Sequence, residues 1–557
     1  MRNVLILMLA LPLLVLTVSC EKGVAADGDN LHGDVAGERL RGEIVLGDRL
    51  ENPYTTVNMR KAYSSLYPTK SSRDAVETTH LYVRFLPADA DELGSLHGMG
   101  LVLYDYPLDY EILVDGDYYH DPGIAEGDIT WQYSVVEKDF VFPRIRYEIL
   151  DECCISESDC ITRASDVDFD ALEREAFRIT GNEGLLEDAT KVAKYIPEGR
   201  LTVSDPDFNN GQKAGVAGIR VVANVFVKIA KGYTDADGYF KLNKGFSASK
   251  IRYRAVFENE RGFDIGFNFV LVPASVASLG KHSSEWMEVH FDRNEDPLAW
   301  RRAIVNNAMY EYWSDCVKDA AVSAPPEDLR IWIMDSMTDD YTLMLHQGAV
   351  WDGSFLDDKF PAIVRILKLF MPDILIGAGD FKYASDLYRD VYHEAAHASH
   401  FSQAGKAYWN NYAASMAANA ITGNDRFGTG ESELDGYSGI AEMWAYYYGS
   451  RYYNRRYDAD GVFGSDCWFK PQALEALEQE GISPSSIFSM FTSELHSIKS
   501  LSEEIRNKYG NDCADCFDVY FGFKSFKDGF KIRGDDDKSG EKLPVGKYPP
   551  RPHLSVK

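Results

Sequence analysis

His393, Glu394 and His397 form an HExxH sequence, and these residue types at this spacing are suited to metal chemistry. On an α-helix, residues four apart lie about 40° apart around the axis and about 6 Å apart along it. Both imidazoles therefore leave the same face and can hold one metal ion. Glu394 points about 100° away, toward the side where an attacking water would lie. This set predicts a catalytic Zn²⁺ site with Glu394 as general base.

The segment around the motif favours the helix that this geometry requires. Residues 385–392 contain no Gly or Pro. Gly405 predicts the end of the helix. Apolar residues recur at helical spacing and give the helix a face to bury: Leu387, Val391, Ala395 and Ala398.

A third metal ligand must come from elsewhere in the chain. The segment 439–448 is again helical in character and carries Glu442, the preferred candidate, because His₂Glu is a known catalytic zinc set. Two alternatives remain open. One is Asp435 or its neighbours Glu431 and Glu433 in the preceding loop, and the other is His400, on nearly the same helix face as His397.

HExxH followed some tens of residues later by a Glu on a second helix resembles the gluzincin metallopeptidases, over roughly residues 297–500. The chain lacks the N-E-x-x-S-D form of the thermolysin-like branch, and Gln403 stands where a metzincin has its third His. The resemblance implies a mainly α, zincin-like catalytic domain, placed at 296–535. In such folds an edge strand before the helix can align an extended peptide, and the segment 373–377 is the expected strand.

A donor that stabilises the oxyanion is also expected in a site of this kind. Four tyrosines are near enough in sequence to supply it, and the sequence does not choose among them: Tyr437, Tyr446, Tyr447 and Tyr448.

The N-terminus has the features of an export signal. Arg2 precedes an apolar run from Val4 to Val18 that is short for a membrane span, and residues 1–20 are therefore predicted to be a signal peptide. Ser19-Cys20 resembles a bacterial lipoprotein cleavage box, with Cys20 as the lipidated residue; a non-lipidated secretory signal is the alternative. Lipidation would tether the protein to the cell envelope, at the outer membrane or cell surface.

The remaining chain divides into further segments, which together predict a multidomain α+β protein. The sequence T-D-x-D-G-x-F-x-L from Thr234 is similar to carboxypeptidase-regulatory-like β-sandwich modules. The expected boundaries are a flexible tether (21–49), a mainly β N-terminal domain (50–160), a helical connector (161–196), the β-sandwich (197–275) and a polar tail (536–557).

The net charge and the cysteines limit the possible partners and disulfide bonds. The 557 residues carry a net charge of −29, which argues against nucleic acid and against an anionic membrane surface as partners. Besides Cys20 there are seven cysteines, and an exported chain permits disulfides. The local candidates are Cys153 or Cys154 with Cys160, and Cys513 with Cys516; for the second pair, reduced thiols in a loop are the alternative.

Two functional hypotheses follow. The first is a lipid-anchored zinc metallohydrolase, a peptidase that cleaves peptide or protein substrates. The second is a non-catalytic binding or scaffold lipoprotein whose zinc site is structural or vestigial. A fully protein-ligated zinc would favour the second, because catalytic sites keep one position open.

Overall fold

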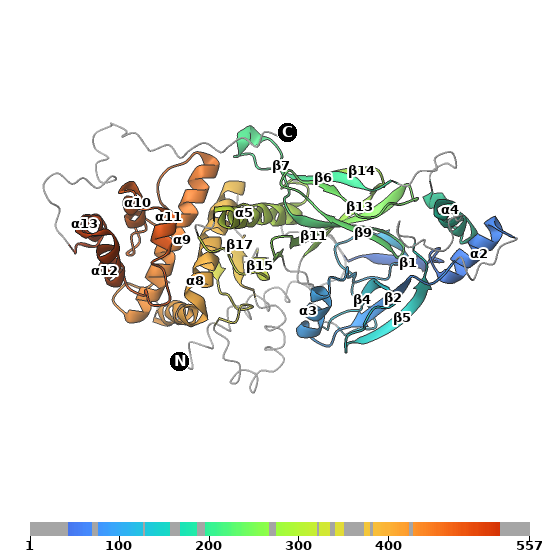
Figure 1. The fold of residues 1–557 in the computed structure, drawn as a ribbon, viewed down its shortest axis with the longest axis horizontal. Coiled ribbons are helices and arrows are strands. Elements are labelled where there is room, and N and C mark those ends of the chain that lie inside the picture. Colours follow the sequence, from blue (N-terminus) through green and yellow to red (C-terminus); the bar gives the residue numbers. More distant parts are fainter. Residues whose placement is uncertain are drawn as a thin grey trace, which may run out of the picture.

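A computed structural model describes residues 43–68, 76–125, 128–155, 168–186, 195–266, 275–319, 322–334, 340–349, 372–378, 383–422 and 427–523. β-rich sheets are followed by a mainly helical C-terminal region (Figure 1), which confirms the predicted mixed α+β, multidomain fold. The predicted signal peptide with Cys20 and the tail at 536–557 lie outside the described residues, as does most of the tether. The end of the tether segment forms strand β1 (Val45–Arg49).

The N-terminal region is built on a three-stranded antiparallel sheet. β2 (His80–Leu86) lies between β4 (Gln132–Glu137) and β5 (Arg146–Cys153), so it is buried along most of its length. A separate ribbon pairs β1 with β3 (Tyr110–Val114). The helices of this part are α2 (Thr56–Leu66), α3 (Ala90–Gly98) and α4 (Phe169–Ile179).

A buried ion pair fastens this region to the β-sandwich that follows. Glu173 of α4 lies 3.0 Å from the Lys228 Nζ atom on β9, and both side chains are almost completely buried. The Tyr54 hydroxyl also donates to Glu173. Removing either charge would leave the other buried without its opposite charge, so this pair links α4 to β9.

The β-sandwich consists of a small sheet and part of a large one. The small sheet runs β10 (Tyr239–Lys241), β6 (Glu198–Val203), β14 (Trp286–Phe291), with β7 (Ala214–Gly215) on β6. The large sheet contributes β8 (Ile219–Val225), β9 (Lys228–Tyr233), β11 (Lys250–Asn259), β12 (Phe263–Ile265) and β13 (Val276–Ser283). Two strands of these sheets, β13 and β14, follow residue 275.

The T-D-x-D-G turn crosses from one sheet to the other, linking β9 to β10. The Asp235 Oδ1 atom accepts hydrogen bonds from the main-chain nitrogens of Asp237 and Tyr239, both at 2.9 Å. Gly238 has φ +81°, and a Cβ there would meet the Leu201 oxygen at 2.0 Å, so only glycine fits. Asp235 is thus a turn former.

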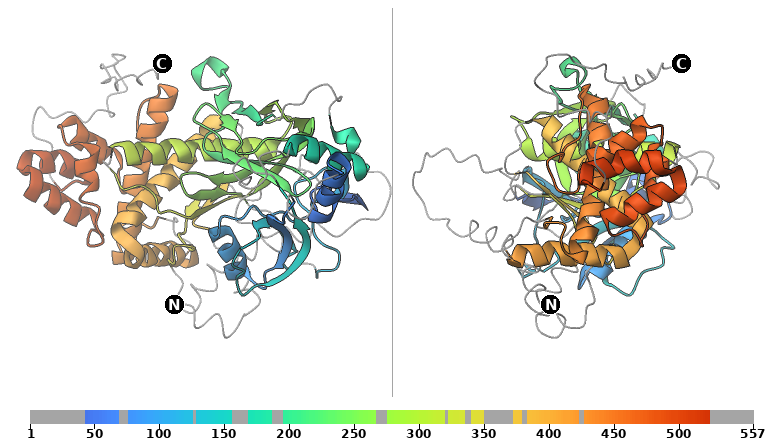
Figure 2. Two further views of the ribbon diagram at one scale, coloured as in Figure 1. Left: turned by 45° about the vertical axis from the view of Figure 1, so that its right-hand side comes forward. Right: turned by 90° about the vertical axis from the view of Figure 1, so that its left-hand side faces the viewer.

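The large sheet continues from the sandwich toward the helices. β12 pairs in parallel with β15 (Leu329–Met334), β15 with β17 (Ile374–Gly377), and β17 antiparallel with β16 (Tyr341–Thr342). The prediction that 373–377 is an edge strand is wrong, because β16 covers its free side and itself ends the strand order among the described residues. α5 (Pro297–Asp319) packs on both sheets and on α8 (Figures 1 and 2).

The helical region is organised around two packed helices, α8 (Ala384–Thr422) and α9 (Glu433–Tyr457). α8 is broken at Gly405 (φ 79°, ψ 175°), where the sequence predicts an end, and a second helical stretch follows. The remaining helices gather at one end of the molecule (Figure 2): α10 (Gln472–Gln479), α11 (Pro484–Phe488), α12 (Ile498–Tyr509) and α13 (Asn511–Asp518). Within the described ranges, none of the helices has the length and apolar character needed to cross a membrane.

The cysteines that the structure describes are free thiols. Cys513 and Cys516 lie three residues apart on α13 and are not bonded to each other, which agrees with the alternative of reduced thiols and not with a disulfide, although a helix holds them where a loop was expected. Cys153 and Cys154 are buried and free, and their proposed partner Cys160 lies outside the described residues.

Candidate metal centre

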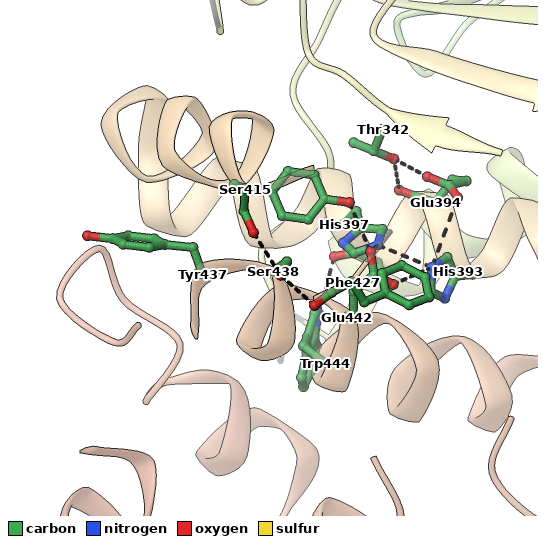
Figure 3. Close-up of polar contacts among 12 residues, drawn as sticks. Thr342, His393, Glu394, His397, Ser415, Phe427, Tyr437, Ser438, Glu442 and Trp444 are labelled. Atoms are coloured by element: carbon green, nitrogen blue, oxygen red, sulfur yellow. Dashed lines mark hydrogen bonds and ion pairs between the residues drawn. The ribbon is translucent and has the colours of Figure 1, made fainter. Parts of the chain in front are cut away.

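Two helices bring His393, His397 and Glu442 together in a group that could hold a metal ion. The two histidines project from the first half of α8, and their Nε2 atoms lie 3.1 Å apart. Glu442 projects from α9, with Oε2 3.3 Å from His393 Nε2 and Oε1 3.4 Å from His397 Nε2 (Figure 3). Both His397 and Glu442 are buried.

These separations fit a small, tetrahedrally coordinated cation. Ligand atoms at about 2.0–2.1 Å from a tetrahedral zinc lie about 3.3 Å from one another. The three donor-to-donor distances, 3.1, 3.3 and 3.4 Å, match that edge length. Among the described residues this group has three members, which leaves one position of a tetrahedron without a protein ligand.

The protonation states of the donors also suit a metal. Burial lowers the pKa of His393, only partly opposed by its hydrogen bond with Glu442. Burial acts to raise the pKa of the Glu442 carboxyl, but the two neighbouring imidazoles outweigh it and hold this pKa below its ordinary value. Near neutral pH the site therefore offers an ionised carboxylate and a neutral imidazole, the forms that bind metals.

The imidazole rings are oriented by packing. Within the described residues, neither Nδ1 atom has a hydrogen-bond partner, whereas a metal-binding histidine usually donates from this atom. The His393 ring lies 4.3 Å from the Tyr446 ring, and the His397 ring lies 5.9 Å from that of Trp409 and 5.7 Å from that of Tyr412. Trp409 and Tyr412 belong to the part of α8 beyond Gly405, so the break in α8 is what folds them back onto the site.

Glu394 lies beside the three donors and is held by the strand next to the helix. Its Oε1 atom is 4.0 Å from His393 Nε2. Its Oε2 atom accepts a 2.5 Å hydrogen bond from the Thr342 hydroxyl on β16 (Figure 3). A carboxylate in this position is within reach of a water bound between it and the donors.

The site opens into a pocket of about 330 Å³. His393, Glu394 and Glu442 form part of its wall. The other lining residues include charged, aromatic and small side chains: Asp340, Tyr341, Arg389, Asp390, Tyr412, Met416, Phe427, Ala445, Tyr446, Gly449, Ser450 and Phe463. A pocket of this size admits one side chain or a short segment of an extended chain.

The two alternatives for the third ligand lie elsewhere. Asp435 is the N3 residue of the capping box of α9, whose N-cap is Ser432. Its carboxylate accepts from the main-chain nitrogens of Thr429 and Gly430 and from the Asn419 amide. Its neighbours Glu431 and Glu433 are exposed. His400 is fully buried against Tyr408, Trp409 and Phe491, and it is not part of the group of donors.

Of the four tyrosines considered as oxyanion donors, Tyr446 lines the pocket. Tyr437 points away from the site (Figure 3) and stacks on His496. The Tyr447 hydroxyl donates to Glu478, and Tyr448 stacks on Trp444.

Two residues of the site, Tyr412 and Thr342, were not predicted from the sequence. The Tyr412 hydroxyl donates to Glu442 Oε1 at 2.9 Å and also faces the pocket. No spacing rule relates either residue to the HExxH motif, because their positions depend on a helix break and on the pairing of a two-residue strand. The nearest signal is the aromatic run Tyr408-Trp409 with Tyr412 after Gly405.

Comparisons of the chain with models of known protein families, with curated proteins and with solved structures found no match. The function must therefore be inferred from the site itself.

Proposed function

We propose that the protein is a zinc-dependent hydrolase, with peptides as its substrates. The observation that carries the proposal is the position of Glu394 beside three convergent donors, at the wall of an open pocket. His393, His397 and Glu442 would hold the ion. When bound, Zn²⁺ supplies Lewis-acid activation of water and of the scissile carbonyl. The resemblance to gluzincins favours a peptide bond as the bond cleaved.

The remaining steps of the proposed reaction depend on protein side chains. Glu394 takes a proton from the attacking water and later gives it to the leaving amine. Tyr341, Tyr412 and Tyr446 are the tyrosines that line the pocket, and they are the candidates for a hydrogen bond to the developing oxyanion. Phe427 and Phe463, which also line the pocket, would exclude water from parts of the substrate.

The alternative, a scaffold with a structural zinc, needs a fourth protein ligand. Within the described residues the donor group has three members, and His400 does not join it. This favours the hydrolase, since catalytic zinc sites keep a position open.

The test is the Glu394→Gln variant, screened with the wild type against a peptide library in the presence and absence of a chelator. We expect the wild type to cleave peptides only when zinc is bound. Glu394→Gln should bind zinc and lose about 10²- to 10⁴-fold in rate. Glu431→Gln, at an exposed position, is the matched control. Full activity of Glu394→Gln, or wild-type cleavage that survives the chelator, contradicts the proposal.

We further propose that Cys20 is lipidated and that the protein is held at the bacterial cell envelope. The support is the sequence alone: a charged start, an apolar run and a small residue before the cysteine. Replacing Cys20 with Ala should release the protein from the membrane fraction, and retention of that variant would contradict lipid anchoring.

A further inference from the structure

Thr342 makes a short contact with the carboxylate that we assign as the general base. Its hydroxyl oxygen lies 2.5 Å from Glu394 Oε2 and 3.1 Å from the main-chain oxygen of Glu394 (Figure 3). The shorter distance is typical of a hydroxyl that donates to a charged carboxylate. Thr342 is 1% exposed and Glu394 3% exposed, so bulk water competes little for this bond.

The direction of the Thr342 hydroxyl is fixed from two sides. Thr342 pairs with Ile374 in the sheet, which sets its main chain. Its main-chain oxygen accepts a 3.2 Å hydrogen bond from the Trp409 indole, beyond the break in α8. A β-branched side chain also has few χ1 rotamers. The sheet and Trp409 therefore hold the Thr342 hydroxyl in a fixed position as a hydrogen-bond donor.

The contact distinguishes the two oxygens of Glu394. Oε2 is bound by Thr342, whereas Oε1 lies toward the metal donors, 4.0 Å from His393 Nε2. A glutamate side chain has three rotatable bonds, and without a fixed partner its carboxylate samples other orientations. A general base must hold its accepting oxygen within hydrogen-bond reach of the proton it takes.

We propose that Thr342 is a positioning residue for this reaction: it holds Glu394 Oε2 so that Oε1 faces the space beside His393, His397 and Glu442. The inference rests on the proposed hydrolase function, because the orientation of Oε1 matters only when Glu394 accepts a proton. A purely structural role, in which the hydroxyl serves the main-chain oxygen of Glu394, is the competing explanation.

The first test uses the zinc-loaded full chain and a peptide that the wild type cleaves. We expect Thr342→Val to lower kcat by about 10- to 100-fold while KM and zinc content stay unchanged. Thr342→Ser, which keeps the hydroxyl, should restore most of kcat. Thr130→Val is the matched control, because Thr130 is equally buried and its hydroxyl also makes a hydrogen bond, but in the N-terminal region.

A double-mutant comparison separates positioning from structure. In a Glu394→Gln background, Thr342→Val should cause no further loss of activity, because the residue through which Thr342 acts is already disabled. If the two losses multiply, or if Thr342→Val leaves kcat at the wild-type value, the proposal is overturned.

A second readout does not require turnover. Acetohydroxamate loses its N–OH proton when it chelates a metal, and a correctly oriented carboxylate beside the ion accepts that proton. We expect Thr342→Val to weaken acetohydroxamate binding to the zinc-loaded protein about tenfold and Thr342→Ser to restore it. Unchanged affinity overturns the positioning role. If no peptide is cleaved but this dependence on Thr342 is found, the hydrolase proposal fails while the positioning of Glu394 stands.

Discussion

Gly449 of α9 lies directly against the main chain of His393 on α8: a β-carbon at position 449 would come within 3.0 Å of the His393 N and Cα atoms. Both helices carry metal donors, Glu442 being two turns before Gly449 on α9. The missing side chain thus allows the close approach of the helices that brings the carboxylate to the imidazoles.

Substituting Gly449 with Ala should therefore weaken zinc binding about tenfold, because the helices must separate by a few tenths of an ångström. Overpacking costs about 1–3 kcal/mol, and the higher helix propensity of Ala offsets about 1 kcal/mol. A zinc titration against a competing chelator measures the effect. Gly94→Ala is the control, since no atom lies within 4 Å of its added carbon. Equal zinc affinity in Gly449→Ala and wild type would show that helix spacing does not set the site.

Removal of the Glu442 carboxylate should abolish tight zinc binding. We expect Glu442→Ala to lose more than about 100-fold in affinity, since replacing even a partner of a metal ligand costs about 10- to 100-fold. Asp435→Asn should keep zinc and instead lower the free energy of unfolding by about 1 kcal/mol, because the Asp435 carboxylate is the N3 member of the capping box of α9. Metal analysis of the purified variants distinguishes the two residues. Zinc lost from Asp435→Asn and retained in Glu442→Ala would reverse the assignment.

His400 should make the metal-free protein sensitive to acid. Burial lowers its pKa from 6.5 to about 3. Below pH 6.5 the unfolded chain therefore binds a proton that the folded chain does not, and the free energy of unfolding falls as the pH falls. Between pH 6.5 and 4.5 this histidine accounts for a loss of about 2 kcal/mol. Phe suits the aromatic surroundings of position 400. In urea unfolding with a chelator present, the free energy of unfolding of His400→Phe should therefore fall by about 2 kcal/mol less than that of the wild type between pH 6.5 and 4.5. An identical pH dependence in the variant would refute the assignment.

Arg456 joins the C-terminal end of α9 to the sandwich and to α5. Its guanidinium lies 2.8 Å from Asp205 and 2.9 Å from Glu311, and it stacks on the rings of Phe208 and Tyr388. The Arg456 and Asp205 side chains are 4% and 0% exposed, so Arg456→Met leaves a buried carboxylate unpaired. We expect a loss of about 3–5 kcal/mol in thermal or denaturant unfolding.

Two further variants test the origin of that loss. Arg455→Met removes a neighbouring arginine that is 32% exposed, and it should cost less than about 1 kcal/mol. Asp205→Asn combined with Arg456→Met should recover part of the stability, because the unpaired charge is gone. No recovery would mean that packing on Phe208 and Tyr388, rather than the ion pair, provides the stability.

Several features of the fold follow from local sequence and were predictable. The turn at Asp235 and Gly238 is set by residues within five positions of one another. The break at Gly405 follows from the same kind of local preference. By contrast, the pairing of β12 with β15 joins the large sheet of the sandwich to the strands beside the metal site. No local sequence pattern predicts this parallel pair, because its two strands are far apart in sequence. The prediction that 373–377 is an edge strand was wrong for a related reason. β16, which pairs with this segment, has only two residues and leaves no recognisable pattern in the sequence.

The sequence by itself determined that His393 and His397 share one face of a helix with Glu394 beside them, because helical periodicity is a property of neighbouring residues. Only the tertiary structure decided which third side chain approaches them. Glu442, Asp435 and His400 were all candidates, and the close helix packing at Gly449 places Glu442 beside the imidazoles while Asp435 belongs to the capping box of α9. Thr342 reaches the site through strand pairing, and Tyr412 reaches it through the break in α8. Both positions depend on contacts between segments that are distant in sequence, and the stability of such contacts depends on the whole packed core.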